Sequence, residues 1–316
     1  GNVSTPYQGC TEEEKSLSPV FPADCPAVCT AQFCGQKRQG APLRPWQHCA
    51  GMEGILQIIK PIPFTVAVPT TAGTGSEVTV TTVITDEKTK HKFPISDFCL
   101  IPNVAVLDPN LTKTLPPHIT ASTGMDALTH AVEAYIGRSA VKSTKRDALE
   151  AAKIIKENLE IAYKDGNNLI ARKNMLRAAF LGGRAFSKSY VGYGHAVAHA
   201  LGGKYKTPHG LANAIILPHI LEIYGEVIYP KLKDFAIAMG VADENNTNKD
   251  AALAFIAEVK RMNKAMGIPE KLAGIDHKDI DELAAYAAKE ANPVYPVPVL
   301  MDKHELKKVF YRIMED

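Results

Sequence analysis

The sequence predicts a mixed fold, in which a short α/β segment is followed by a larger all-α domain. Three observations predict it. Short β-branched runs separated by Gly and Pro occupy residues 64–107. Beyond Pro116-Pro117, almost every segment has the 3.6-residue apolar period of a helix. Five of the six cysteines precede residue 52, so the first part of the chain differs in composition from the rest.

Residues 1–51 receive no assignment, because they show no sustained period of 2 or 3.6. Their odd number of cysteines and the cysteine-poor remainder argue against a secreted disulfide module. Cys25, Cys29 and Cys34 could bind a metal, although their spacing fits no established pattern. We interpret residues 1–51 as irregular or artefactual, through a shifted reading frame or a truncation, with a genuine replacement as the alternative.

The α/β segment is expected over residues 52–115. Its order is a buried strand, a tight loop, a β-hairpin and a second short buried strand, at residues 64–69, 70–76, 78–95 and 104–107.

The helical domain is expected over residues 116–316. Its clearest helices are predicted at residues 119–136, 143–163, 171–186, 249–266, 279–290 and 302–314. Thr247 is expected to cap the helix that ends before Gly267. Pro218 lies in an apolar stretch, residues 211–224, and is expected to kink or break that helix.

The composition limits the kinds of partner. The formal net charge of +2 and the absence of a long basic run give no reason to expect nucleic acid or an anionic membrane. No uninterrupted apolar run approaches the roughly 18 residues of a spanning helix, and the first residues do not resemble a signal peptide. We expect a cytoplasmic protein of 316 residues with a small substrate.

Asp126 and His130 are four residues apart, so a helix presents both side chains on one face. Alone this pair is weak evidence for a metal site, because an Asp and a His at this spacing more often form a surface hydrogen bond or ion pair. The helix is otherwise largely apolar, and a carboxylate that faces a packed interior needs a compensating partner. The pair is therefore a candidate part of a metal site.

Three of the ten histidines fall within fifteen residues, at His195, His199 and His209. The first two are one helical turn apart, and the third follows Pro208 at a possible helix start. Any single one could be a satisfied core histidine. Together with Asp126 and His130 they offer nitrogen and oxygen ligands for a divalent first-row metal, which would act as a Lewis acid on an alcohol oxygen. The helical part has no cysteine, so a Cys-rich structural zinc site is excluded there.

From about residue 62 onward the chain resembles the iron-containing alcohol dehydrogenases, which include butanol and 1,3-propanediol dehydrogenases and lactaldehyde reductase. Four motifs carry the resemblance: Pro69-Thr-Thr-Ala-Gly-Thr-Gly-Ser-Glu-Val-Thr79, Gly124-Met-Asp-Ala-Leu-Thr-His130, His195-Ala-Val-Ala-His-Ala-Leu-Gly202 and Thr207-Pro-His-Gly-Leu-Ala-Asn213. It implies an incomplete dinucleotide-binding (Rossmann-like) domain followed by a helical metal-binding domain of the dehydroquinate-synthase-like type.

The resemblance also assigns roles within the histidine cluster. It implies Fe²⁺, with Zn²⁺ as the alternative, held by four ligands: Asp126, His130, His195 and His209. His199 is then unliganded, and proton handling is what its imidazole would permit.

NAD or NADP is the implied cofactor, lined by Thr70, Thr71, Gly73 and Thr74, with Lys92 near the nicotinamide-side ribose. The alternative without a cofactor is that the loop is an ordinary turn and that Lys92 is a solvated lysine on an edge strand. The family's Gly-Gly-Gly-Ser-x-x-Asp segment, which cradles the pyrophosphate, is not found in residues 1–61.

The expected function is hydride transfer between a short aliphatic alcohol or diol and NAD(P), as an alcohol dehydrogenase or aldehyde reductase. The tail Asn292-Pro-Val-Tyr-Pro-Val-Pro298 resembles butanol-dehydrogenase-like members and favours such substrates. A truncated non-catalytic metal-binding relative and a zinc-dependent polyol dehydrogenase are the alternatives. The resemblance implies a homodimer or larger homo-oligomer.

Overall fold

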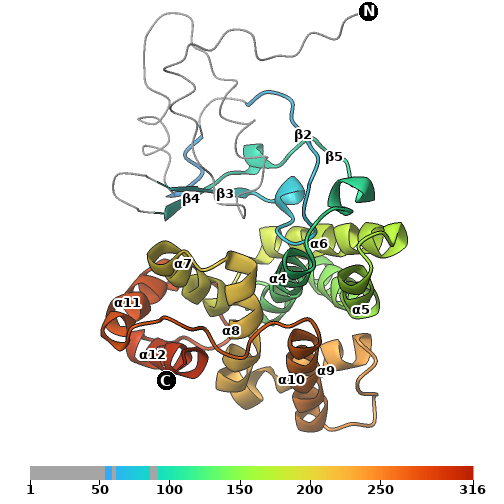
Figure 1. Cartoon of the computed structure of the whole chain (residues 1–316). Helices are drawn as coiled ribbons and strands as arrows, with labels where there is room; N and C mark the ends of the chain where they lie inside the picture. The colour runs from blue at the N-terminus through green and yellow to red at the C-terminus, as the bar shows by residue number, and fades with distance from the viewer. Residues whose placement is uncertain (1–53, 59–61, 86–91, 316) are drawn as a thin grey trace, which may run out of the picture.

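The computed structural model describes residues 54–58, 62–85 and 92–315 (Figure 1). The region left unassigned above, residues 1–51, lies outside these described residues. Within the described residues, Figure 1 shows the strands gathered at one end and the α-helices at the other. A mostly helical protein with a few short strands is therefore observed, as the sequence predicts.

The strands form two small sheets. The predicted hairpin is confirmed, because β3 (Thr81–Thr85) pairs antiparallel with β4 (Lys92–Ser96), which also pairs in parallel with β1 (Gly54–Ile55). The two predicted single strands pair with each other in parallel, as β2 (Val66–Ala67) and β5 (Val104–Ala105). The prediction that the second of them is buried is wrong, because Val104 is 42% and Val106 is 43% exposed.

The prediction that residues 64–69 form a buried strand is wrong for one of its faces. Ala67 is buried, whereas Phe64 is 73% and Val66 is 52% exposed. A continuous apolar run is typical of a parallel strand covered on both faces, but the described chain covers this strand on one face only.

Nine α-helices follow in the described part of the chain. They are α4 (Pro117–Ile136), α5 (Lys142–Lys164), α6 (Leu169–Ser189), α7 (Tyr193–Tyr205), α8 (His209–Tyr224), α9 (Tyr229–Ala238), α10 (Asn248–Ala265), α11 (Ile280–Ala291) and α12 (Lys303–Ile313). The six clearest predicted helices are confirmed within a few residues at each end. Thr247 caps α10 by accepting a hydrogen bond from the Asp250 amide at 3.1 Å, as expected.

Helix α4 lies at the centre of the helical domain and packs against α5, α6 and α8. All its residues from Gly124 to its end are buried. A Cβ at Gly124 would lie 2.2 Å from Leu159 Cδ1, so a larger residue there would force this side chain of α5 to move. The motif that contains Asp126 is therefore held inside the core by close helix packing.

Of the predicted kink or break at Pro218, the break is wrong, because α8 runs through this residue from His209 to Tyr224. Proline has no amide N–H to donate to the carbonyl of Ala214, one turn earlier. The buried side chain of Asn263 on α10 donates to that carbonyl at 2.6 Å instead. A side chain from a neighbouring helix thus donates to the carbonyl that proline cannot reach with an N–H, and the helix continues.

One helical stretch of the described residues, His209–Ala238, is long and apolar enough to span a membrane. Its most apolar window is 61% buried inside the protein, and it includes α8, which packs against α4, α7, α10 and α12. Such burial is typical of a core helix.

The loop at residues 70–76 seats the α/β segment on the helical domain. Gly75 has φ +62°, and a Cβ there would lie 2.7 Å from Gly183 Cα on α6. A Cβ at Gly73 would lie 2.6 Å from the Thr123 carbonyl oxygen on α4. The two loop glycines therefore allow close packing against helices α6 and α4.

Candidate metal centre

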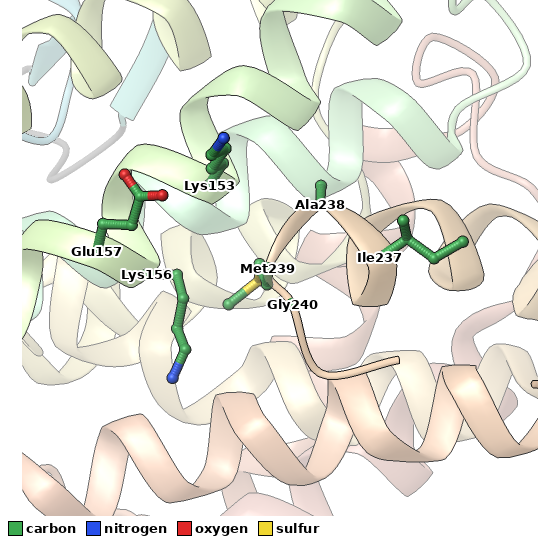
Figure 2. Close-up of a pocket in the computed structure, with 7 residues that line it drawn as sticks. All are labelled: Lys153, Lys156, Glu157, Ile237, Ala238, Met239 and Gly240. Carbon is green, nitrogen blue, oxygen red and sulfur yellow. The ribbon is translucent and has the colours of Figure 1, made fainter. Parts of the chain in front are cut away.

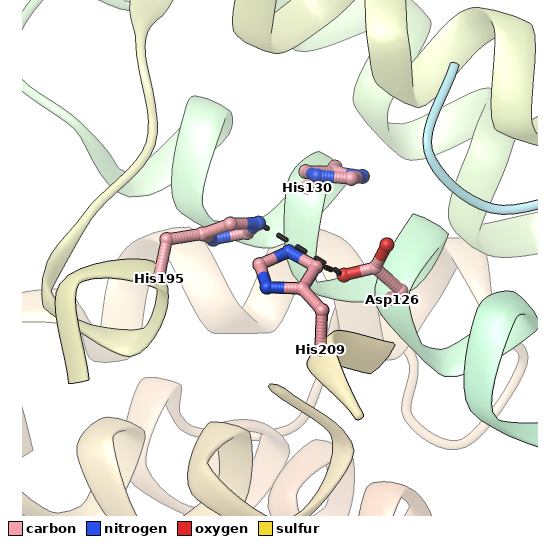
Figure 3. A group of neighbouring side chains, drawn as sticks. All are labelled: Asp126, His130, His195 and His209. Carbon is pink, nitrogen blue, oxygen red and sulfur yellow. Dashed lines mark ion pairs between the residues drawn. The ribbon is translucent and has the colours of Figure 1, made fainter. Parts of the chain in front are cut away.

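Four side chains from three helices converge at one point (Figure 3). Asp126 and His130 come from α4, His195 from α7 and His209 from α8. One potential ligand atom of each lies within 4.8 Å of the others. Asp126 Oδ1 lies 3.6 Å from His209 Nε2 and 3.9 Å from His195 Nε2. The structure thus brings together the four residues that the sequence predicts as metal ligands.

Local sequence explains how the three helices meet. Asp126 and His130 lie one turn apart on the buried α4. His209 is the first residue of α8, directly after Pro208. The next residue, Gly210, allows α8 to start against α4, since a Cβ there would lie 2.7 Å from the Ser122 carbonyl oxygen.

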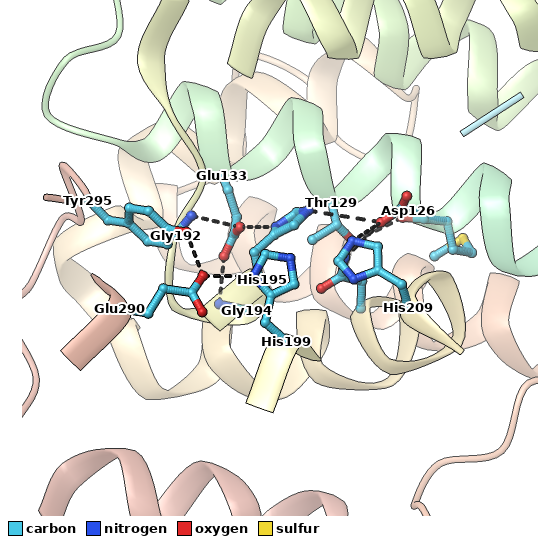
Figure 4. Close-up of polar contacts among 12 residues, drawn as sticks. Asp126, Thr129, Glu133, Gly192, Gly194, His195, His199, His209, Glu290 and Tyr295 are labelled. Atoms are coloured by element: carbon cyan, nitrogen blue, oxygen red, sulfur yellow. Dashed lines mark hydrogen bonds and ion pairs between the residues drawn. The ribbon is translucent and has the colours of Figure 1, made fainter. Parts of the chain in front are cut away.

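Glu133 is a site residue that the sequence analysis missed (Figure 4). Its Oε2 accepts a hydrogen bond from His195 Nδ1 at 2.6 Å and from the Gly192 amide at 2.8 Å, while Oε1 accepts from the Gly194 amide at 2.8 Å. Burial raises the pKa of this carboxyl to about 7, against the opposing effect of the two amides. The signal was present, because residues 126, 130 and 133 share one helical face.

The contact with Glu133 determines which nitrogen of His195 points to the site. Because Nδ1 donates its hydrogen to the carboxylate, Nε2 carries the lone pair. That buried Nε2 has no hydrogen-bond partner among the described residues, nor has Nδ1 of His130. Buried polar atoms normally have partners, so these two orphaned nitrogens fit a missing ligand such as a metal ion.

The protonation states also fit a cation. Burial lowers the pKa of His195 well below its usual value and that of His209 to about 3, so both imidazoles are neutral. Burial alone would raise the pKa of Asp126, but the three histidines and Asn213 outweigh it and lower this pKa. Neutral imidazoles and an ionised carboxylate are the forms that bind divalent metals.

Asn213 supports the cluster from the next turn of α8. Its Nδ2 donates to Asp126 Oδ1 at 2.7 Å and lies 3.1 Å from His209 Nε2. The side chain is fully buried. It belongs to a motif that the sequence singled out, but its contact with Asp126 spans 87 residues and was not predicted.

His199 lies beside the four converging residues rather than among them. Its ring stacks on that of His209, with centroids 5.1 Å apart at 20°, and its centroid is 6.1 Å from that of His195. The side chain is 29% exposed. A partly exposed imidazole at the edge of the cluster is accessible to a small substrate.

The residues expected at the cofactor differ in their exposure to solvent. Thr70 is exposed, and Thr71 and Thr74 are partly exposed, whereas Gly73 is buried against Thr123. The backbone of Lys92 lies in β4, but its side chain is outside the part of the chain that the structure describes. The loop nevertheless reaches α4 only three residues before Asp126.

A cavity of roughly 280 Å³ lies elsewhere, between α5 and the end of α9 (Figure 2). Its lining includes Lys153, Lys156 and Glu157 of α5. Neither helix carries a residue of the metal centre, so this cavity is separate from it.

Glu77 in η2 (Ser76–Val78) supports a prediction about pH. It is 3% exposed, its Oε1 has no hydrogen-bond partner among the described residues, and burial raises its pKa from 4.5 to about 7. The folded chain thus holds this proton more tightly than the unfolded chain. Its stabilising contribution is complete below pH 4.5 and is lost as the pH rises to about 7.

Glu77→Gln, which has no proton to lose, is expected to remove this dependence. Between those pH values the wild type should lose up to about 3 kcal/mol of unfolding free energy relative to the variant. Urea denaturation at a series of pH values measures the difference. Parallel curves for the two proteins would show that the prediction is wrong.

The fold and the site together define a mostly helical protein with a candidate divalent-metal centre. Residues 120–314 match the family model described as "Fe-containing alcohol dehydrogenase family, C-terminal". Residues 38–109 match a second family model, described as "Iron-containing alcohol dehydrogenase". The chain belongs to the iron-containing alcohol dehydrogenase family.

Named relatives agree with this membership. The chain is 42% identical to 1,3-propanediol dehydrogenase of Citrobacter freundii over 260 residues, covering 81% of this chain and 67% of that protein. It is 39% identical to lactaldehyde reductase of Escherichia coli (strain K12) over 238 residues, covering 75% and 62%. The chain thus spans about two thirds of the length of these relatives.

Solved structures resemble it as well. An alcohol dehydrogenase from Oenococcus oeni superposes with a TM-score of 0.81 at 34% identity, covering 90% of this chain and 72% of that one. A 1,3-propanediol oxidoreductase gives a TM-score of 0.80 at 40% identity, covering 83% and 69%.

Proposed function

We propose that this chain transfers hydride between a short aliphatic alcohol or diol and NAD or NADP, with iron or zinc at the four-residue centre. The convergence of Asp126, His130, His195 and His209, with a buried lone pair on His195 Nε2, is the observation that carries the proposal. A relative named NADPH-dependent butanol dehydrogenase, 38% identical over 250 residues, supports this substrate class.

The ion would supply Lewis-acid chemistry that lowers the pKa of a substrate hydroxyl, and the nicotinamide would accept the hydride. The protein's own residues do the rest. Asp126 and the three histidines would fix the ion, while Glu133 and Asn213 orient two of those ligands. His199 Nε2 would take the hydroxyl proton during oxidation and return it during reduction.

The loop at residues 70–76 supports the cofactor assignment, because its exposed and partly exposed threonines offer hydroxyl groups beside α4. We assign Thr70, Thr71, Gly73, Thr74 and Lys92 to the cofactor side. Residues 52–115 would then form part of a Rossmann-like domain, and residues 116–316 the metal-binding domain. A cytoplasmic homodimer or larger homo-oligomer stays a prediction.

Activity with defined metal content tests the proposal. The chain loaded with Fe²⁺ or Zn²⁺ is expected to oxidise 1-butanol or 1,3-propanediol with NAD⁺ or NADP⁺. Chelation should abolish the turnover and added metal should restore it. Metal binding without any nicotinamide affinity in calorimetry would favour a non-catalytic metal-binding relative instead.

A further inference from the structure

His199 is the inner end of a short hydrogen-bonded chain that leads away from the metal centre (Figure 4). His199 Nδ1 lies 2.7 Å from Glu290 Oε1, and the Tyr295 hydroxyl donates to the same oxygen at 2.6 Å. One carboxylate oxygen thus accepts from two donors. Burial raises the pKa of Tyr295 well above its usual range, so the phenol stays a donor.

The segment that carries Tyr295 is fixed to the start of α7. Tyr193 is fully buried, its hydroxyl lies 2.6 Å from Asn292 Oδ1, and it accepts from the Met301 amide at 3.0 Å. Tyr193 is two residues before His195. The tail is therefore held against the helix that carries both His195 and His199.

We propose that Glu290 and Tyr295 are positioning residues for His199, which hold its ring in the tautomer protonated at Nδ1 so that Nε2 carries the lone pair that exchanges a proton with substrate. The inference rests on the proposed function for the role of that proton. The tautomer itself follows from the acceptor oxygen at Nδ1, because a carboxylate can only accept there. Tyr295 keeps that oxygen in place by donating to it.

The tautomer can be read without activity. Imidazole ¹⁵N spectra of the zinc-loaded chain, with His199 assigned by its loss in His199→Gln, are expected to show a pyrrole-type Nδ1 and a pyridine-type Nε2. Glu290→Ala should shift the ring toward the other tautomer. In turnover assays it should lower kcat by about 10- to 100-fold, with KM and zinc content unchanged.

Two further variants separate positioning from folding. Glu290→Gln keeps an acceptor oxygen, which Tyr295 holds toward His199, so it should retain the wild-type tautomer and most of kcat. Adding Tyr295→Phe frees the amide to turn its nitrogen toward His199, which should move the tautomer as Glu290→Ala does. Glu244→Ala, at an exposed glutamate in the loop before α10, is the matched control.

The inference is overturned if the wild-type ring carries its proton on Nε2, or if Glu290→Ala leaves the tautomer and kcat unchanged. Equal losses of kcat in Glu290→Gln and Glu290→Ala without a tautomer change would overturn it too. A wild-type chain that shows the expected tautomer but no metal-dependent turnover would remove the proposed function and leave the positioning contact established.

Discussion

His195→Ala is expected to weaken metal binding by more than about 100-fold and to reduce alcohol oxidation at least as much. Losing a partner that merely orients a ligand costs about 10- to 100-fold, and this change removes a ligand itself. It also leaves Glu133 without one of its three donors. Competition with a chromophoric chelator measures the affinity, and turnover at saturating metal measures the second effect.

The matched control is His304→Ala, because His304 is an exposed histidine on α12 and is not part of the metal centre. It should leave both quantities at the wild-type level. Thermal unfolding of the metal-free proteins shows whether His195→Ala still folds. A folded His195→Ala chain that retains one ion with wild-type affinity would exclude His195 as a ligand.

Glu133→Gln is expected to weaken metal binding by about 10- to 100-fold, although Glu133 is not a ligand. The carboxylate accepts three hydrogen bonds, from His195 Nδ1 and the amides of Gly192 and Gly194. Glutamine offers one acceptor oxygen, so its amide group must face at least one of these donors. His195 loses its fixed orientation, and the start of α7 loses part of its support.

Glu258→Gln serves as the control for Glu133→Gln, since Glu258 is also a largely buried glutamate. It pairs with Lys156 and Arg261, outside the metal centre. The control should change stability without changing metal affinity. If both variants bind metal as tightly as the wild type, Glu133 has only a structural role.

Only the two halves of the candidate metal centre were predictable from spacing. Asp126 and His130 are one turn apart on one helix, and His195 and His209 lie close together in the sequence. That the two halves meet was expected from the family resemblance, not from spacing. Helix ends were predictable from local sequence, through residues such as Thr247 that cap within one turn.

Contacts between distant segments were not predictable from spacing. Glu133 meets His195 across 62 residues, and Glu290 meets His199 across 91. The same limit explains why the break expected at Pro218 does not occur, since the compensating donor, Asn263, lies on another helix. Local sequence patterns predict which face of a helix a residue occupies, but not which residue of another element it contacts.

The contact between Gly75 and Gly183 has a consequence for engineering. The backbones at Gly75 and Gly183 are in contact. A side chain at either position would therefore require the loop or helix α6 to move. Grafting a loop from a relative should therefore succeed only when glycine is kept at both positions. Libraries that vary residues 70–76 should hold Gly75 constant and leave α6 untouched at Gly183.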